Sequence, residues 1–178
     1  MNHLGGHANI THLDQGVLEM AKTMGLRTML DIGCGPGGML KLAGEMGFTC
    51  EGIDGMPGKN QIKEVRINIH DFTTGAFQHK QTYDLGYSCE FVEHVREEYL
   101  DNFMNSFKSC RFVFMTFAPP GTPGHHHVNC RNEQYWKDKF KENGFEYLQE
   151  ETLNLRKSST MKRDFVRKCG LVFRNLDL

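Results

Sequence analysis

Two patterns of apolar residues alternate along the chain: stretches with helical spacing and short, nearly continuous runs typical of strands. Between residues 11 and 24 apolar residues return every three or four positions, which predicts a helix with Thr11 as its N-cap and Gly25 as its end. Shorter apolar runs predict strands at 27–32, 49–53, 63–69, 83–88 and 111–117. Helical spacing separates several of these runs, at 39–46, from Val92 to Phe107, and at 132–141. Residues 145–155 and 165–173 would then supply a final antiparallel hairpin.

A strand–helix–strand order of this kind predicts a parallel sheet with right-handed crossovers. The run at 111–117 is almost wholly apolar, as expected of a central strand that is buried on both faces. We therefore expect residues 1–178 to form a single domain with an α/β, Rossmann-like fold. Its central sheet would be mostly parallel, with about seven strands, helices on both faces and an antiparallel C-terminal edge.

The composition narrows the classes of protein to which the chain can belong. Apolar residues make up 39% and charged residues 24% of 178 residues, and the formal net charge is -1. These values exclude a disordered or globally basic chain, and the length is too short for a two-domain dehydrogenase. The N-terminus has no secretory pattern and no apolar run could cross a bilayer, so we expect a cytoplasmic protein without a membrane partner. Six cysteines without a CxxC pair argue against a zinc ribbon or a disulfide framework.

A glycine-rich turn directly follows the first predicted strand. Gly33, Gly35 and Gly38 satisfy the GxGxxG spacing, so a nicotinamide dinucleotide would fit this turn by pattern alone. Glycines in such a turn let the backbone approach a ligand closely, and the helix that follows directs its positive end at the ligand. Three further features point to a different cofactor: Asp31 before the first glycine, a proline within the turn, and Asp54 after the next predicted strand.

Together these residues resemble the first motif, DxGxGxG, of the class I S-adenosylmethionine (SAM) methyltransferases. In that family the first acidic residue holds the methionine end of SAM and the second binds the ribose hydroxyls, and these roles map onto Asp31 and Asp54. Asp71 and Phe72 would contact the adenine, although an ordinary Asp at a strand end is an equal alternative. The resemblance implies a cofactor site made of Asp31, Gly33, Gly35, Gly37, Asp54, Gly55, Met56, Asp71, Phe72 and Cys89.

A second constellation follows the fourth predicted strand. Glu90, Glu93, His94 and Glu97 have i, i+3, i+4, i+7 spacing, which would place them on one face of a helix. Carboxylates and an imidazole in one helical turn suit a divalent cation. Two alternatives need no metal: the acidic residues could simply stabilise the N-terminus of a helix, or Glu93 and His94 could be a Glu–His pair that binds no metal.

Three consecutive histidines follow the fifth predicted strand. If this segment is extended, His125 and His127 point one way and His126 the other. An ExxEH sequence followed by such a histidine resembles the metal-dependent 2'-O-methyltransferases of small-RNA 3' ends. The resemblance implies catalytic roles for His94 and His127, and Mg²⁺, Mn²⁺ or Co²⁺ as the cation. Its metal ligands would be Glu90, Glu93, His94, His125 and His127. A substrate-facing hydrogen-bonding loop or a polar surface turn is the alternative for these three histidines.

The region 91–95 and the loop 119–130 resemble a group of small stand-alone methyltransferases met often in bacteriophage genomes. A phage-encoded protein of this group would work in the host cytoplasm. The resemblance does not identify the methyl acceptor.

Two motifs that the sequence lacks limit which kind of atom could accept the methyl group. No Asp/Asn-Pro-Pro-Tyr/Phe follows the fourth predicted strand, as in enzymes that methylate amines of bases, and Cys89 is preceded by Ser88 instead of proline. Oxygen is therefore the expected acceptor, on a small molecule or a nucleic acid. Residues 156–168 carry six basic residues against one acidic residue, which fits a phosphate-bearing substrate or simply a solvated basic face. The rival functions are a noncatalytic SAM-binding regulatory module and a small NAD(P)-binding oxidoreductase.

Overall fold

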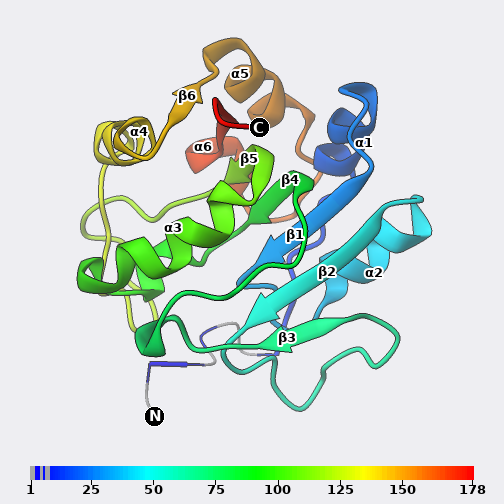
Figure 1. Cartoon of the computed structure of the whole chain (residues 1–178), viewed down its shortest axis with the longest axis horizontal. Coiled ribbons are helices and arrows are strands. Elements are labelled where there is room, and N and C mark those ends of the chain that lie inside the picture. Colours follow the sequence, from blue (N-terminus) through cyan, green and yellow to red (C-terminus); the bar gives the residue numbers. More distant parts are fainter. Residues whose placement is uncertain (1–2, 5, 7–8) are drawn as a thin grey trace.

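The computed structural model describes residues 3–4, 6 and 9–178, and within them seven strands form one sheet (Figure 1). The strand order is β3-β2-β1-β4-β5-β7-β6. The strands are β1 (Thr28–Ile32), β2 (Thr49–Asp54), β3 (Ile67–Ile69), β4 (Tyr83–Ser88), β5 (Cys110–Met115), β6 (Phe145–Tyr147) and β7 (Leu171–Asn175). The first five pair in parallel, and β7 is antiparallel to both β5 and β6. The predicted fold class, a mostly parallel sheet with an antiparallel edge, is confirmed.

The described residues also form six α-helices, of which α1 precedes the first strand, and three short 3-10 turns. The α-helices are α1 (Gln15–Thr23), α2 (Gly38–Glu45), α3 (Leu100–Lys108), α4 (Glu133–Glu142), α5 (Gln149–Ser158) and α6 (Phe165–Cys169). The 3-10 turns are η1 (Phe72–Thr74), η2 (Val92–His94) and η3 (Glu97–Tyr99). In the described part of the chain, no helix combines the length and the apolar composition that a membrane span requires.

The sheet separates two hydrophobic clusters, as expected when its strands are buried on both faces. Neighbouring residues of β1 belong to different clusters: Leu30 packs in the one and Met29 in the other, because successive side chains of a strand point to opposite faces. The first cluster contains residues of α3 and α4, and the second contains residues of α1, α2, α5 and α6. The helices therefore cover both faces of the sheet.

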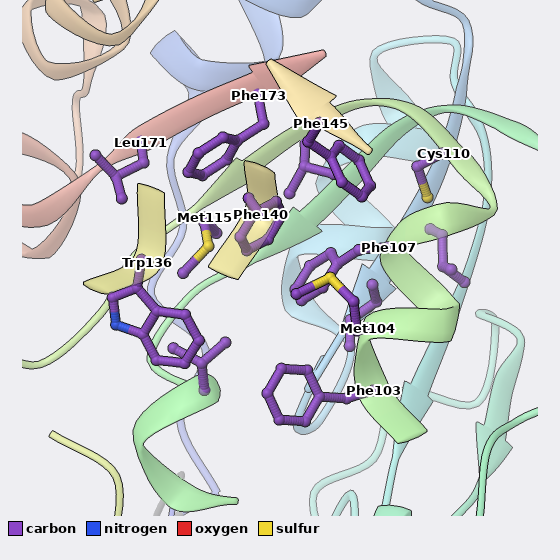
Figure 2. Packing of buried hydrophobic residues seen from close by; sticks show 14 of the residues in the cluster. Phe103, Met104, Phe107, Cys110, Met115, Trp136, Phe140, Phe145, Leu171 and Phe173 are labelled. Carbon is purple, nitrogen blue, oxygen red and sulfur yellow. The ribbon is translucent and has the colours of Figure 1, made fainter. Parts of the chain in front are cut away.

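Aromatic side chains dominate the cluster under α3 and α4 (Figure 2). Phe103 and Phe107 come from α3, and Trp136 and Phe140 come from α4. The ring of Phe140 stacks on that of Phe173 from β7, with ring centroids 4.1 Å apart and planes 13° from parallel. Burying large rings in this way contributes most of the packing energy that holds α4 and the antiparallel edge on the sheet.

Two predicted elements differ from the structure near the chain ends. The first helix is capped by Asp14, whose Oδ1 accepts from Val17 N at 3.2 Å, whereas Thr11 Oγ1 accepts from Gly38 N at 3.1 Å. The predicted C-terminal strands 145–155 and 165–173 do pair antiparallel, but only through β6 and β7. The rest of both segments is wrong, because α5 and α6 lie between these two strands and no hairpin turn joins them. Thr152 and Leu155 are the buried residues of α5, and their spacing of three is helical.

The segment after β4 is also different from the prediction. Instead of one helix from Val92 to Phe107, η2 and η3 come first and α3 begins only at Leu100. The third strand is shorter than expected, since only Ile67–Ile69 of the predicted 63–69 pairs with β2.

Asp14 joins the start of α1 to the loop before α6. Its side chain is buried and accepts hydrogen bonds from Val17 N at 3.2 Å, from Thr160 N at 2.9 Å and from the Ser159 hydroxyl. Asp14→Ala should therefore lower the free energy of unfolding by about 2–4 kcal/mol, since it removes an N-cap and leaves buried donors without an acceptor. Urea denaturation measures this loss, with Gln15→Ala at the adjacent exposed position as the control. A loss below about 1 kcal/mol would contradict this role for Asp14.

Candidate functional site

A cavity of about 880 Å³ lies where the parallel strands β1, β2 and β4 end. Each strand contributes a residue to its wall: Asp31 from β1, Asp54 from β2 and Tyr87 from β4. The carboxyl ends of parallel strands are the usual ligand-binding edge of an open α/β sheet. The volume is in the range of pockets that bind small molecules and cofactors.

The glycine-rich turn between β1 and α2 forms one wall. Gly33 and Gly37 have φ angles of +77° and +90°, a conformation that residues with side chains rarely adopt. A Cβ on Gly33 would lie 2.5 Å from Cδ2 of Phe91, and a Cβ on Gly37 would lie 2.7 Å from Cγ2 of Val65. Close approach at these two positions therefore serves packing within the protein, and Gly37 does not line the cavity.

Two acidic residues flank this turn. Oδ2 of Asp54 accepts from Gly35 N at 2.8 Å and Oδ1 accepts from Met56 N at 2.7 Å, so this carboxylate ties the turn to the end of β2. Asp31 is buried, and burial together with the nearby charge of Asp54 raises the pKa of Asp31 to about 8. A buried carboxyl of this kind favours a cationic partner, since a positive charge would restore its ionised form.

Asp71 and Phe72 lie at another part of the wall. Asp71 caps η1, where its Oδ1 accepts from Thr73 N at 2.9 Å, and its Oδ2 is bonded to Nε2 of His3 at 2.9 Å. Phe72 packs edge-on against Phe91 with ring centroids 5.6 Å apart. Eight of the ten predicted cofactor residues line the cavity, namely Asp31, Gly33, Gly35, Asp54, Gly55, Asp71, Phe72 and Cys89, whereas Gly37 and Met56 do not.

The predicted helical face from Glu90 to Glu97 is wrong. Glu90 has a φ of +54°, and its N–H donates to Thr116 Oγ1 at the end of β5 at 2.8 Å. A residue within an α-helix cannot adopt this left-handed conformation, so Glu90 does not share a helical face with Glu93, His94 and Glu97. Glu97 consequently faces away from the other acidic residues and binds Tyr135, whose hydroxyl donates to it at 2.9 Å, and Arg131.

Glu93, His94 and His127 nevertheless meet, by a different route. Within the described residues these three side chains each offer one ligand atom, and the atoms lie within 4.8 Å of one another. The histidine loop is joined to η2 because the carbonyl of Glu93 accepts from Val128 N at 2.9 Å and from Asn129 N at 3.0 Å. Glu90 and His125 line the cavity but do not belong to this group of three.

The loop is not extended, so the predicted alternation of its three histidines is wrong. His126 has a φ of +48°, and a turn covers His125 and His126. Nδ1 of His127 lies 3.0 Å from the carbonyl oxygen of Thr122. A carbonyl only accepts, so Nδ1 carries the proton and Nε2 of the neutral ring keeps its lone pair. His127 is thus prepared to bind a metal or to accept a proton.

The electrostatics of this group are unusual. Burial and the charge of Glu90 raise the pKa of Glu93 to about 8, whereas burial and the nearby His127 lower the pKa of His94 to about 4. Both carboxylate oxygens of Glu93 and Nδ1 of His94 are buried, and none has a hydrogen-bond partner among the described residues. Leaving a buried polar atom unpaired costs about 1–3 kcal/mol, so three such atoms together indicate a place for a ligand.

Several residues of the cavity wall escaped the sequence analysis. His3, Leu4 and Gly6 cross it from the N-terminal segment, which has no motif or periodic pattern. Arg163 and Phe165 line it from the region before and at the start of α6. The basic run 156–168 was a signal for Arg163, but the sequence did not show which of its six cations would lie at the cavity.

The chain was compared with known families and structures. A family model for the methyltransferase domain matches residues 7–165. No curated protein sequence matches the chain. A solved structure of magnesium protoporphyrin IX methyltransferase (ChlM) from Synechocystis PCC 6803 with bound SAM is similar, with a TM-score of 0.59 and 16% identity over 88% of this chain and 74% of that chain.

Two other solved structures are similar over most of their length. The methyltransferase domain of bacterial-CtHen1-C has a TM-score of 0.60 and 19% identity, over 89% of this chain and 94% of that chain. Burkholderia thailandensis 1,6-didemethyltoxoflavin-N1-methyltransferase has a TM-score of 0.65 and 11% identity, over 91% of this chain and 77% of that chain. The family match covers more than half of the sequence, so the chain belongs to the methyltransferase domain family, and its sheet has the Rossmann-like class I methyltransferase fold.

Proposed function

We propose that this chain transfers the methyl group of SAM to an oxygen atom of a small-molecule or nucleic-acid acceptor, with a divalent cation bound beside the reacting atoms. The observation that carries the proposal is the group of Glu93, His94 and His127, in which buried oxygens and a nitrogen have no hydrogen-bond partner among the described residues. His94 and His127 line the same cavity as the glycine turn, and Glu93 is buried behind them.

The cavity offers a group for each part of SAM, which supports the proposed cofactor. Asp71 and Phe72 would take the adenine, and the carboxylate of Asp54 would accept from the ribose hydroxyls. Asp31 would bind the ammonium group of the methionine end, which supplies the positive charge that its buried carboxyl needs. Among the similar structures, that of ChlM contains SAM and that of the toxoflavin N1-methyltransferase contains S-adenosylhomocysteine. The family match to a methyltransferase domain counts against the nicotinamide alternative.

Glu93, His94 and His127 would hold the cation. A pKa of about 4 keeps His94 neutral at pH 7, and a base this weak takes few protons from a hydroxyl, so the ring suits metal binding better than general-base catalysis. Nε2 of His127 has its lone pair available, because Nδ1 is committed to the Thr122 carbonyl. A mixed carboxylate and imidazole set fits Mn²⁺, Co²⁺ or Mg²⁺. When bound, such a cation lowers the pKa of an oxygen that it coordinates.

The reaction asks little covalent chemistry of the protein, because the methyl group of SAM is already activated on a sulfonium. The chain's residues must hold the acceptor in line with that methyl group and keep water away. The Glu90-Phe91 turn after β4 has no amine-cradling proline motif, which favours an oxygen acceptor. As ligands of the cation, His94 and His127 would orient the acceptor hydroxyl indirectly, by holding the cation that binds it.

Turnover tests the whole proposal. Radiolabelled SAM incubated with the protein and with RNA, DNA, protein and small-molecule fractions should label one fraction, and fragmentation of the purified product in a mass spectrometer should place the methyl group on an oxygen atom. A noncatalytic SAM-binding module would bind SAM and label none of the fractions, and label confined to nitrogen would contradict the oxygen acceptor.

The role of Asp54 is tested by Asp54→Ala. The ribose hydroxyls lose a charged acceptor worth about 1.5–3 kcal/mol, so the affinity for SAM should fall about 10- to 150-fold by calorimetry. Asp138→Ala, at an exposed position of α4, is the control. Circular dichroism must show that the variant is folded, because Asp54 also holds Gly35 and Met56. An unchanged dissociation constant would place SAM elsewhere.

The raised pKa of Asp31 predicts a pH dependence of stability. Between about pH 4 and pH 8 the cofactor-free folded protein binds a proton at Asp31 that the unfolded chain has lost, so the contribution of this group falls as the pH rises. Asp31→Asn removes this titrating group. The free energy of unfolding of the variant, relative to that of the wild type, should therefore rise steadily from about pH 5 to pH 8. Urea titrations of both proteins measure the difference. Parallel pH profiles would show that the carboxyl is already compensated.

The cation site is tested by Mn²⁺ binding to chelator-treated protein, measured by calorimetry. The wild type should bind Mn²⁺, and His94→Ala or His127→Ala should each lower the affinity about 10-fold or more, while SAM binding persists. His126→Ala is the matched control, because the group of three does not include this neighbouring histidine. No binding by the wild type, or an equal loss in the His126 variant, would leave Glu93, His94 and His127 as a metal-free polar group.

A further inference from the structure

Arg163 is a cation at the cavity wall that the proposed function has not yet used. Its guanidinium carbon lies 5.4 Å from the centroid of the Phe165 ring. His12 packs edge-on against the same ring, with centroids 5.0 Å apart. Arg163 and His12 therefore both pack against the ring of Phe165, and all three residues line the cavity.

The N-terminal segment holds the loop of Arg163 against the start of α2. Thr11 Oγ1 accepts from the N–H of Gly38, the first residue of α2, and the N–H of Asp14 contacts Met39 Sδ at 3.2 Å. The Asp14 carboxylate in turn accepts from Thr160 N at 2.9 Å. Two residues separate Thr160 from Arg163, so this network brings the loop of Arg163 next to the start of α2, which directly follows the glycine turn.

Arg163 also differs from its neighbours in its ion pairs. Arg156 pairs with Glu133, and Arg167 and Lys168 both pair with Asp164. Within the described ranges Arg163 has no carboxylate partner, and of the six cations in 156–168 it is the one that lines the cavity.

A ligand with a zwitterionic end matches this arrangement. The methionine end of SAM carries an ammonium group and a carboxylate, and Asp31 can satisfy only the first. Among the described arginines and lysines, Arg96 and Arg163 line the cavity. Burial and the positive charges of His3 and Arg96 lower the pKa of His126, so Arg96 lies near His126. The His126 ring is near that of His3, which is hydrogen-bonded to Asp71 at the proposed adenine end. Arg163 is the cation left for the methionine end.

We propose that Arg163 binds the carboxylate of the methionine end of SAM, a role that rests on the proposed cofactor site. Arg163 and Asp31 then form a complementary pair for the two charges of the amino-acid group. A carboxylate or phosphate on the acceptor would have the same chemistry at Arg163, and the experiment separates these two sources of the anion.

The test compares SAM with its decarboxylated analogue and with 5'-methylthioadenosine, which lacks the amino-acid group, by calorimetry. The wild type should bind SAM about tenfold or more tightly than the decarboxylated analogue, since a hydrogen-bonded charge pair is lost. Arg163→Gln should weaken SAM by the same factor and leave the decarboxylated analogue and methylthioadenosine unchanged. Arg163→Lys should keep part of the preference, and Lys162→Gln, an exposed neighbouring cation, should keep all of it.

Each other outcome has a distinct meaning. If Arg163→Gln leaves the preference for SAM over its decarboxylated analogue intact, the proposal is overturned, and the guanidinium is available to an anion of the acceptor instead. If the variant weakens both ligands equally, its effect is structural and the proposal also fails. A wild-type protein that binds none of the three adenosine compounds would refute the cofactor site itself, whereas binding without preference would refute Arg163 alone.

Discussion

Parallel pairing of β1 with both β2 and β4 is the constraint on which the site depends. Because the register aligns Ile32 with Ile53 and Asp31 with Tyr87, the three strands end at one edge of the sheet. The chain must turn sharply there, and the turns carry the acidic residues Asp54 and Glu90 into the same cavity as Asp31. Helices on both faces exclude water from the strands, so acids at this edge are partly desolvated. Their chemistry follows from the topology of the sheet.

The sequence predicted the parts of the fold that local pattern controls. The βαβ unit from β1 to β2 and the strands β4 and β5 lie where their apolar runs indicated, and the glycine turn lies between β1 and α2. The errors arose where a distant contact decides the conformation. The N–H of Glu90 donates to Thr116 at the end of β5, and Glu90 has a left-handed conformation that no residue within a helix adopts. No spacing rule within 90–97 contains that information. The prediction for residues 149–158 was wrong for another reason. Only Thr152 and Leu155 of this polar helix are buried, so its apolar residues show neither a clear helical nor a clear strand spacing.

The candidate site shows the same division between local and distant determinants. The sequence predicted Glu90, Glu93, His94, His125 and His127 as one set of metal ligands. The structure brings together three of them, Glu93, His94 and His127, although the expected helical face does not exist. They meet because the Glu93 carbonyl binds two amides of the loop after β5, a contact between segments some 35 residues apart that only the tertiary structure reveals. In the sequence Arg163 is one of six similar cations. In the structure Asp14 holds the 159–160 loop, and of these six cations Arg163 lines the cavity. Chemistry was readable from the sequence, whereas selection among equivalent residues required the fold.

Asp31 and Glu93 have the same electrostatic problem in different parts of the site. Burial, with a second carboxylate nearby, raises the pKa of each to about 8, so near neutral pH each holds a proton that water would have removed. A cation that displaces that proton recovers the full charge interaction in a region of low dielectric, where it is stronger than at the surface. The site is therefore least stable when empty, and ligands that bring positive charge stabilise the folded state by mass action. An ammonium and sulfonium at one end and a divalent cation at the other would satisfy both carboxyls, and the two ligands would then bind with little mutual repulsion because each is neutralised by its own acid.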